Sequence, residues 1–233
     1  KDLETNNIDS VKAIALIRAY RIRGHLIAKL DPLELMNRDY VHELHPSDHG
    51  FEKEDYKRKI YLDNYMDLGY ANISEILSKL RRIYCSTIGA QYMHISDPKE
   101  KVWIRERFEK EENKLNFTNN GKKAILNKII QAEGFEKFLA TKYVGTKRFG
   151  LDGAESLIPA LEQIIKRGGQ LGVKEVKIGM SHRGRLNVLA NVLQKSYKRI
   201  FNEFAGEISN IEEESAGDVK YHLGASSNRE FDG

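Results

Sequence analysis

The chain has 233 residues, of which 40% are hydrophobic and 31% are charged, and its formal net charge is +4. This length suits one large domain or two small ones, and so mild and interspersed a charge does not by itself indicate a nucleic-acid partner. The single cysteine, Cys85, excludes a framework of internal disulfides and fits a reducing compartment, and no apolar run is long enough to predict a membrane-spanning helix.

The first predicted helix begins with a cap at Asp9 or Ser10 and stops near residues 31–32, where Asp-Pro disfavours helical backbone. One side of this helix is expected to be apolar, with Val11, Ile14, Ala15, Ile22 and Leu26. The other side is basic, with Arg18, Arg21 and Arg23. Such a face suits acidic partners or RNA, but a solvated or internally paired face is favoured, because exposed ion pairs are common and weak.

A histidine-rich stretch follows, with His42, His45 and His49 close to Asp39 and Asp48. Spacings of three and four residues suit a metal site on a helix. A proline and a glycine interrupt this stretch, however, so that a continuous helix is disfavoured. We therefore predict an ordered polar loop and no metal ligands.

Two further helices are predicted before residue 118. The first begins at Ser74 and has an apolar stripe of Ile76, Leu77, Leu80, Ile83 and Tyr84. The second begins at Asp97-Pro98, where an acidic cap, a proline and Glu100 at the third helical position form a start signal. Its stripe is expected to contain Ile104, Phe108 and Leu115, and Trp103 is expected in the core.

The turn cluster Asn-Asn-Gly at residues 119–121 is the best boundary signal. We predict two domains, a helical region at residues 1–118 and an α/β region at residues 119–233. The second region begins with a helix whose apolar face contains Ile125, Ile129, Ala132, Phe135, Phe138 and Leu139. A short extended piece is expected at residues 147–149.

A turn at Asp152-Gly153 then leads into another helix, and this helix is expected to end at Gly168-Gly169. Pro159 fits this helix only in its first turn. The residues expected to face inward are Leu157, Ile158, Leu161, Ile164 and Ile165.

The stretch at residues 174–193 changes period in the middle. Its first half alternates apolar and other residues, as a strand with one buried face does, at Val176, Ile178 and Met180. Its second half has helical spacing, at Leu186, Leu189, Ala190 and Leu193. Helix, strand and helix in succession indicate the α/β fold class.

The loop between this strand and helix, residues 181–185, reads Ser-His-Arg-Gly-Arg. Loops in this position bind ligands in open α/β sheets, and guanidinium groups beside a helix N-terminus favour phosphate or carboxylate. His182 can hold or release a proton near neutral pH. Gly184 allows a positive φ or a close approach to a ligand. Spacing alone leaves a solvated basic turn as the alternative.

Residues 179–192, Gly-Met-Ser-His-Arg-Gly-Arg-Leu-Asn-Val-Leu-Ala-Asn-Val, resemble a segment of the 2-oxoglutarate dehydrogenase family. Further segments resemble the same family in the same order, at residues 18–25, 30–33, 88–95, 132–139, 145–151 and 217–224. Colinear agreement over this length is hard to obtain by accident. The chain is therefore identified as the N-terminal portion of a longer member of this family.

The resemblance implies a thiamin diphosphate-binding α/β domain that begins at residue 119, with an incomplete sheet. It implies an oxidoreductase that binds thiamin diphosphate and Mg²⁺, decarboxylates 2-oxoglutarate, and passes the succinyl group to the lipoyl arm of dihydrolipoyl succinyltransferase in the tricarboxylic acid cycle. His182 matches an active-site histidine with roles in substrate binding and proton transfer. Arg183 matches a residue that contacts the cofactor diphosphate and the substrate. Arg185 is expected to support the loop.

The resemblance also implies that other parts of the site lie downstream of Gly233, including the Mg²⁺-binding Gly-Asp and asparagine motif, the glutamate that activates the cofactor and a second histidine. Gly217-Asp218 imitates the metal motif with too few residues after it, and His222 has no assigned role. A homodimer with sites at the subunit interface is the expected active form. The 233-residue chain alone is expected to be inactive.

Two alternatives remain. The basic helix at residues 11–23 would be an interaction module for partner proteins or RNA, or the chain would come from a related thiamin enzyme that acts on pyruvate or a sugar. The expected location is the cytoplasm of a bacterium, or the mitochondrial matrix of a eukaryote. A Gly-Asp and asparagine motif in the sequence beyond Gly233 would separate the enzyme from the module.

Overall fold

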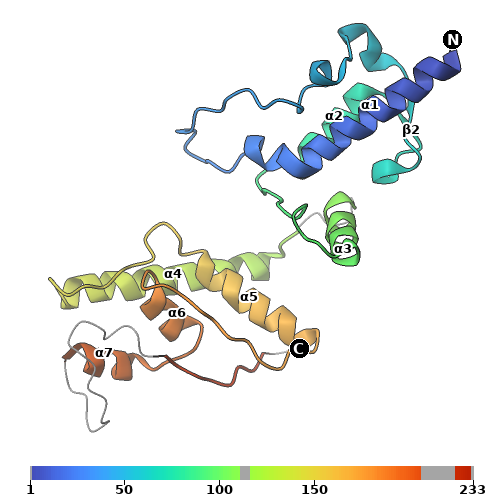
Figure 1. Ribbon diagram of the computed structural model, residues 1–233. Coiled ribbons are helices and arrows are strands. Elements are labelled where there is room, and N and C mark those ends of the chain that lie inside the picture. The colour runs from blue at the N-terminus through green and yellow to red at the C-terminus, as the bar shows by residue number, and fades with distance from the viewer. Residues whose placement is uncertain (1, 111–115, 206–223, 232–233) are drawn as a thin grey trace. The chain divides into compact units, whose positions relative to one another are not determined.

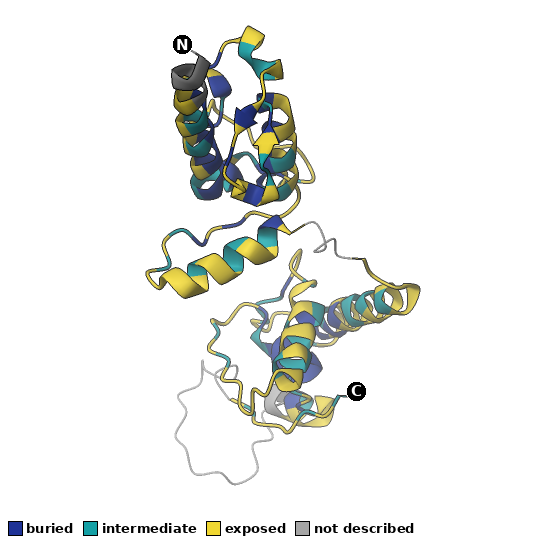
Figure 2. Ribbon diagram, turned by 90° about the vertical axis from the view of Figure 1, so that its right-hand side faces the viewer, coloured by how far each residue is buried: buried dark blue, intermediate teal, exposed yellow. Residues whose placement is uncertain are grey.

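The computed structural model describes residues 2–110, 116–205 and 224–231 (Figure 1). The chain divides into two compact units, residues 1–115 and 116–233, and each has its own buried core (Figure 2). The helical first unit is compatible with the predicted helical region. The second unit was predicted to be an α/β region, but the regular elements described in it are all helices.

The first unit is built on two packed helices, α1 (Asp2–Arg23) and α2 (Ile73–Tyr84), with a third, α3 (Pro98–Glu109). The long connection between α1 and α2 holds short 3₁₀ helices, at Gly24–Ile27, Pro46–His49, Lys53–Lys57 and Tyr65–Asp67. It also holds a two-stranded antiparallel sheet of β1 (Ile60–Tyr61) and β2 (Tyr70–Ala71), in which Ile60 lies opposite Ala71. The core contains fully buried Leu16, Ile17, Tyr20, Ile60, Leu62, Ile73, Ile76 and Leu80.

Helix α1 differs from the prediction in both its start and its buried face. It begins before residue 9, and Asp9 is a buried residue inside the helix that accepts a 2.7 Å hydrogen bond from Arg58 Nε. Val11 is 69% exposed and Leu26 is 52% exposed, whereas Leu16 and Tyr20 are fully buried. Apolar residues occur on more than one side of α1, so helical spacing alone was compatible with two different buried faces. Packing against α2 and β1 selects the face that the prediction missed.

The basic side chains of α1 are largely paired within the first unit. Arg21 is buried and donates from Nε and Nη2 to the two carboxylate oxygens of Glu109, at 2.7 and 2.9 Å. Burial alone would lower the pKa of Arg21, but hydrogen bonds to Glu109 and its charge raise that pKa overall. Arg23 forms an ion pair with Glu43, and Arg18 is exposed. The internally paired interpretation is therefore confirmed for Arg21 and Arg23.

The start of α3 is as predicted, and the start of α2 is not. Asp97 accepts hydrogen bonds from the N–H groups of Lys99 and Glu100 at 2.7 and 3.3 Å, with a proline at the first helical position. Helix α2 begins earlier than predicted, because Asn72 and not Ser74 caps it and accepts from Glu75 N at 2.9 Å.

The expected core position of Trp103 is wrong. Its side chain is 58% exposed, and the Arg107 guanidinium lies over the ring at 4.6 Å from the centroid. Ile104 and Phe108 pack partly buried against the core, and Leu115 lies outside the described residues.

The histidine-rich stretch forms a polar loop. The Tyr40 ring stacks on His45 at 4.1 Å between centroids, and Asp48 accepts from the Tyr40 hydroxyl at 2.8 Å. His49 Nε2 lies 2.8 Å from the backbone oxygen of Glu43. In the described parts of the chain, no three His, Cys, Asp or Glu side chains are placed to share a metal ion.

The second unit contains α4 (Asn119–Lys142), α5 (Leu157–Gln170), α6 (Arg185–Asn191) and α7 (Tyr197–Ala205). Thr118 caps α4 and accepts from Gly121 N at 3.1 Å. Residues 119–121 therefore form the first turn of this helix and not a turn between helices. The short helix α6 packs against both α4 and α5, and six of its seven residues are buried (Figure 1).

Two apolar clusters form the core of the second unit around α6. The first contains Ala132, Leu151, Ile158, Val188 and Val192. The second contains Phe135, Leu139, Leu186, Ala190 and Ile200. Pro159 lies in the first turn of α5 as predicted, but Phe138 and Ile164 are 48% and 62% exposed and do not face inward as predicted.

The predicted strand at residues 176–180 is not observed as a paired strand. Residues 173–180 form neither a helix nor a paired strand, and Val176 is 47% exposed. Residues 147–149 form no strand either. A strand needs a neighbour to accept its hydrogen bonds, and the described residues of the second unit offer none.

Candidate functional site

The loop at residues 181–184 joins the unpaired segment 173–180 to α6. Ser181, His182 and Arg183 are exposed, and Gly184 is buried. Arg185, the first residue of α6, donates to the backbone oxygens of Met180 and, at 3.3 Å, Ser181. Arg185 thus supports the loop, as expected.

Gly184 allows this loop to pack closely against the rest of the unit. Its φ is +74°, and a Cβ atom added there would lie 2.3 Å from Leu151 Cδ1. The expected positive φ is therefore observed. The close neighbour is a side chain of the same chain, however, and not the ligand that the sequence suggested.

Residues 149–151 form the floor of the loop. Gly184 N donates to the backbone oxygen of Phe149 at 2.8 Å, and Arg183 Nη1 lies 3.5 Å from the backbone oxygen of Gly150. The rings of His182 and Phe149 are 4.4 Å apart between centroids, at an angle of 48°. These contacts join segments that lie far apart in the sequence.

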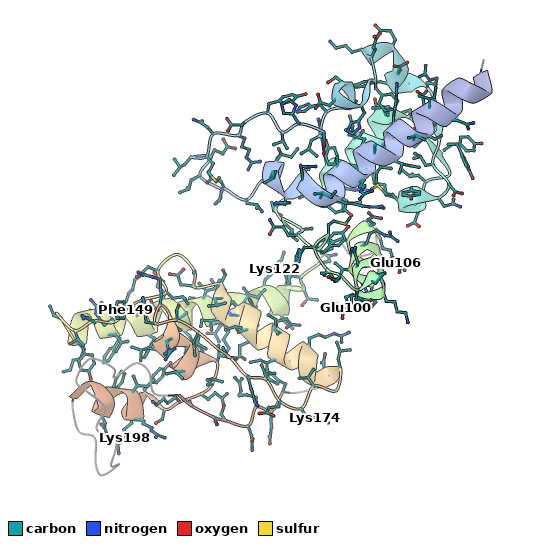
Figure 3. All side chains as sticks on the ribbon, in the orientation of Figure 1. Glu100, Glu106, Lys122, Phe149, Lys174 and Lys198 are labelled. Atoms are coloured by element: carbon teal, nitrogen blue, oxygen red, sulfur yellow. The ribbon has the colours of Figure 1, made fainter. Side chains whose placement is uncertain are left out.

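Phe149 was not among the predicted site residues. It lies on the loop that connects α4 to α5 (Figure 3) and has a φ of +43°, which is unusual for a residue with a side chain. The only sequence signal was its place in the segment 145–151, which resembles the family. The hydrophobic periodicity of the sequence does not indicate the contact between Phe149 and His182.

Glu136 of α4 lies below residues 149–151. Its two carboxylate oxygens accept from Leu151 N at 2.7 and 2.8 Å, and Oε1 also accepts from Asn187 Nδ2 at 2.9 Å. Asn187 donates in addition to the backbone oxygen of Ala132 at 3.0 Å. A partly buried chain of hydrogen bonds therefore connects α4, the floor segment and α6.

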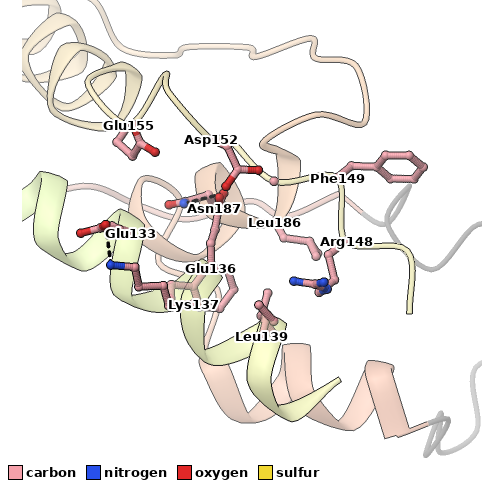
Figure 4. Close-up of a pocket in the computed structure, with 13 residues that line it drawn as sticks. Glu133, Glu136, Lys137, Leu139, Arg148, Phe149, Asp152, Glu155, Leu186 and Asn187 are labelled. Carbon is pink, nitrogen blue, oxygen red and sulfur yellow. Dashed lines mark hydrogen bonds and ion pairs between the residues drawn. The ribbon is translucent and has the colours of Figure 1, made fainter. Parts of the chain in front are cut away.

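A pocket of about 300 Å³ lies between α4, the segment 148–155 and α6 (Figure 4). Arg148 lines the pocket, whereas the Phe149 ring points away from the Arg148 side chain. The Arg148 Nε atom is buried and has no hydrogen-bond partner among the described residues. A polar group of this kind favours a water molecule or ligand oxygen beside it.

The side chains of the loop are suited to bind an anion, whereas the backbone N–H groups at the start of α6 are not available for one. The N–H groups of Gly184 and Arg185 are bonded to the backbone oxygens of Phe149 and His182, at 2.8 and 3.2 Å. The exposed guanidinium of Arg183 and the exposed imidazole of His182 remain available, and both bind oxygen atoms of phosphates and carboxylates. These two side chains fit a diphosphate or a carboxylate. Gly217-Asp218 and His222 lie outside the described residues.

Comparison with known proteins gives relatives that match nearly the whole chain. Over 228 residues the chain is 61% identical to the 2-oxoglutarate dehydrogenase E1 components of Brucella canis, Brucella suis and Brucella abortus. The chain resembles 2-oxoglutarate dehydrogenase E1. The resemblance inferred from the sequence motifs is thereby confirmed.

The match covers 97% of this chain and 23% of the length of these bacterial relatives. A scan against protein-family models found no match. Within the described ranges, each helix is too short or too polar to cross a membrane. The roles of His182 and Arg183 and the two-domain boundary at residue 118 stay predictions.

Proposed function

We propose that this chain forms part of a 2-oxoglutarate dehydrogenase E1 component. The full-length protein would decarboxylate 2-oxoglutarate and transfer the succinyl group to the lipoyl arm of dihydrolipoyl succinyltransferase, in the tricarboxylic acid cycle. The observation that carries this proposal is 61% identity over 97% of the chain. In addition, His182 and Arg183 are both exposed on the loop before α6.

Thiamin diphosphate, when bound, would supply the electron sink that decarboxylation of a 2-oxo acid requires. Arg183 would hold an oxyanion of the diphosphate or the substrate through its planar set of donors. His182 would donate a hydrogen bond to the substrate and transfer a proton at Nδ1 or Nε2. Phe149 would orient the imidazole, because the two rings are in contact.

The metal is expected to be held outside the described residues. Among the described residues, no three His, Cys, Asp or Glu side chains are placed to share a metal ion. We therefore propose that Mg²⁺ ligands come from sequence downstream of Gly233, in a homodimer with sites at the subunit interface.

The alternative of an interaction module is less well supported. Its basic helix face was the reason to consider it, but Arg21 is buried against Glu109 and Arg23 pairs with Glu43. Only Arg18 of the three predicted arginines is both exposed and without a named ion pair among the described contacts. The other alternative is a related thiamin enzyme that acts on another 2-oxo acid, and the choice of substrate in the following experiment tests it.

The test uses the full-length protein that carries this chain, with thiamin diphosphate, Mg²⁺ and an artificial electron acceptor. We expect 2-oxoglutarate to be oxidised with a higher kcat/KM than pyruvate. Preference for pyruvate would identify the related-enzyme alternative. Absence of turnover with either acid, in a protein that binds thiamin diphosphate, would contradict the proposal.

A further inference from the structure

We propose that Glu136 is a positioning residue for the loop that carries His182 and Arg183. This inference rests on the proposed function, because it concerns how the same site is held in place. Glu136 does not touch the loop itself. It acts through residues 149–151, which contact Glu136 on one side and the loop on the other.

The carboxylate of Glu136 is the fixed end of this connection. Its two oxygens share the single N–H group of Leu151 in a three-centre hydrogen bond, with N···O distances of 2.7 and 2.8 Å. Another hydrogen bond, from Asn187 Nδ2, attaches it to α6 directly after the loop. Hydrogen bonds to an ionised carboxylate are stronger than neutral ones, so this group holds three segments in one arrangement.

Two glycines make the close packing possible. A Cβ atom at Gly150 would lie 2.7 Å from Asp152 Oδ2 and 2.9 Å from Glu136 Oε2, and one at Gly184 would lie 2.3 Å from Leu151 Cδ1. Side chains at either position would push the floor segment away from α4 or from the loop. The contacts therefore form a continuous stack in which α4 supports the floor and the floor supports the loop.

The positive φ of Phe149 strengthens the argument. A residue with a side chain keeps φ near +43° only where its surroundings hold it. The backbone oxygen of Phe149 accepts the hydrogen bond from Gly184 N. Two residues later in the chain, Leu151 N donates to Glu136. Without the carboxylate, we expect Phe149 to relax and the His182 ring to lose its neighbour.

The test compares Glu136→Gln with Glu133→Gln in the full-length protein. Glu133 lies one turn earlier on α4 and loses the same charge, but its ion pair is with the exposed Lys137. In Glu136→Gln the remaining amide oxygen can still accept from Leu151 N and Asn187 Nδ2, but the amide nitrogen that replaces Oε2 places a donor against the Leu151 N–H group. The variant therefore loses the charge and the second contact to Leu151. A second control, Ile200→Val, lowers the stability of the same unit from a fully buried position away from the floor.

Two readouts are measured. Amide hydrogen exchange at residues 149–151 and 182–185 should become about 10- to 100-fold faster in Glu136→Gln and unchanged in Glu133→Gln. The kcat with 2-oxoglutarate should fall about 10- to 100-fold in Glu136→Gln at a temperature where the protein is fully folded. Ile200→Val should lower the melting temperature and leave kcat within a factor of two. Glu136→Asp, which keeps the charge on a shorter side chain, should recover part of kcat.

Unchanged exchange at residues 182–185 in Glu136→Gln would overturn the inference, whatever the enzyme does. So would a loss of kcat that Ile200→Val reproduces at an equal loss of stability. If the wild-type protein does not oxidise 2-oxoglutarate, the proposed function fails, and the exchange measurement still decides whether Glu136 positions the loop.

Discussion

The ring of His182 lies 4.4 Å from the ring of Phe149, centroid to centroid, at an angle of 48°. The two residues come from different loops, one after α4 and one before α6. Phe149 limits the orientations of the imidazole on one side, while the other side of His182 is exposed. This contact makes His182 a candidate for an oriented acid or base rather than a freely rotating surface side chain.

The first prediction concerns His182→Ala in the full-length protein. We expect kcat/KM for 2-oxoglutarate to fall about 10- to 1000-fold, the range of general acid–base and oxyanion-binding groups. The melting temperature should stay unchanged, because the side chain is exposed. Steady-state kinetics with an artificial acceptor measure the effect, and turnover within a factor of two of wild type would remove His182 from the mechanism.

The second prediction concerns Arg183→Ala, which removes an exposed guanidinium whose contact to Gly150 O is long, at 3.5 Å. We expect thiamin diphosphate binding to weaken by roughly 1.5 to 3 kcal/mol, the value of a hydrogen bond to a charged group. Arg183→Lys should rescue only part of this loss, because lysine lacks the planar fork. Titration calorimetry measures both variants. Equal affinities for all three proteins would show that Arg183 faces elsewhere.

The third prediction compares two glycines of the same region. Gly184→Ala should lower the free energy of unfolding by about 2 kcal/mol or more, because φ is +74° and the new Cβ would overlap Leu151. Gly179→Ala should have little effect, since no atom lies within 4 Å of a Cβ there. Chemical denaturation of both variants tests this pair. Equal stabilities would mean that the loop does not pack on Leu151.

The fourth prediction concerns pH and Cys85. Burial raises the pKa of the Cys85 thiol to about 11, from an ordinary value of 9.0. A raised pKa in the folded state stabilises the fold below about pH 9, and this contribution is lost as pH rises toward 11. The stability difference between wild type and Cys85→Ala should therefore shrink, by at most about 2 kcal/mol, over this window. A difference that stays constant from pH 8 to pH 11 would contradict the prediction.

The fifth prediction concerns residues 1–233 as an isolated chain. Exposed apolar side chains on and near the unpaired segment 173–180 include Leu171, Val173 and Val176, at 70%, 49% and 47% exposure. We expect this chain to self-associate, because apolar groups gathered on a surface favour association. It should also lack turnover with 2-oxoglutarate, thiamin diphosphate and Mg²⁺. A monomer by size-exclusion chromatography with light scattering, or decarboxylation above a heat-killed control, would contradict it.

The sequence by itself determined where several helices form. Asp97 before Pro98 predicted the start of α3, and the spacing after Leu186 predicted α6. Pro159 also occupies the first turn of α5 as required. These features depend on hydrogen bonds and φ restrictions within a few residues of each other, so the local sequence contains them.

The tertiary structure alone decided which sides of the helices are buried and which loops meet. Tyr20 and not Val11 faces the core, and Trp103 is exposed, because the surfaces that cover a helix come from distant segments. The contacts of Glu136 with Leu151 and of His182 with Phe149 likewise join distant residues. The unpaired segment 173–180 likewise shows that a local pattern does not decide tertiary pairing. Alternation marks a chain that can be a strand, but only a neighbouring strand accepts its hydrogen bonds.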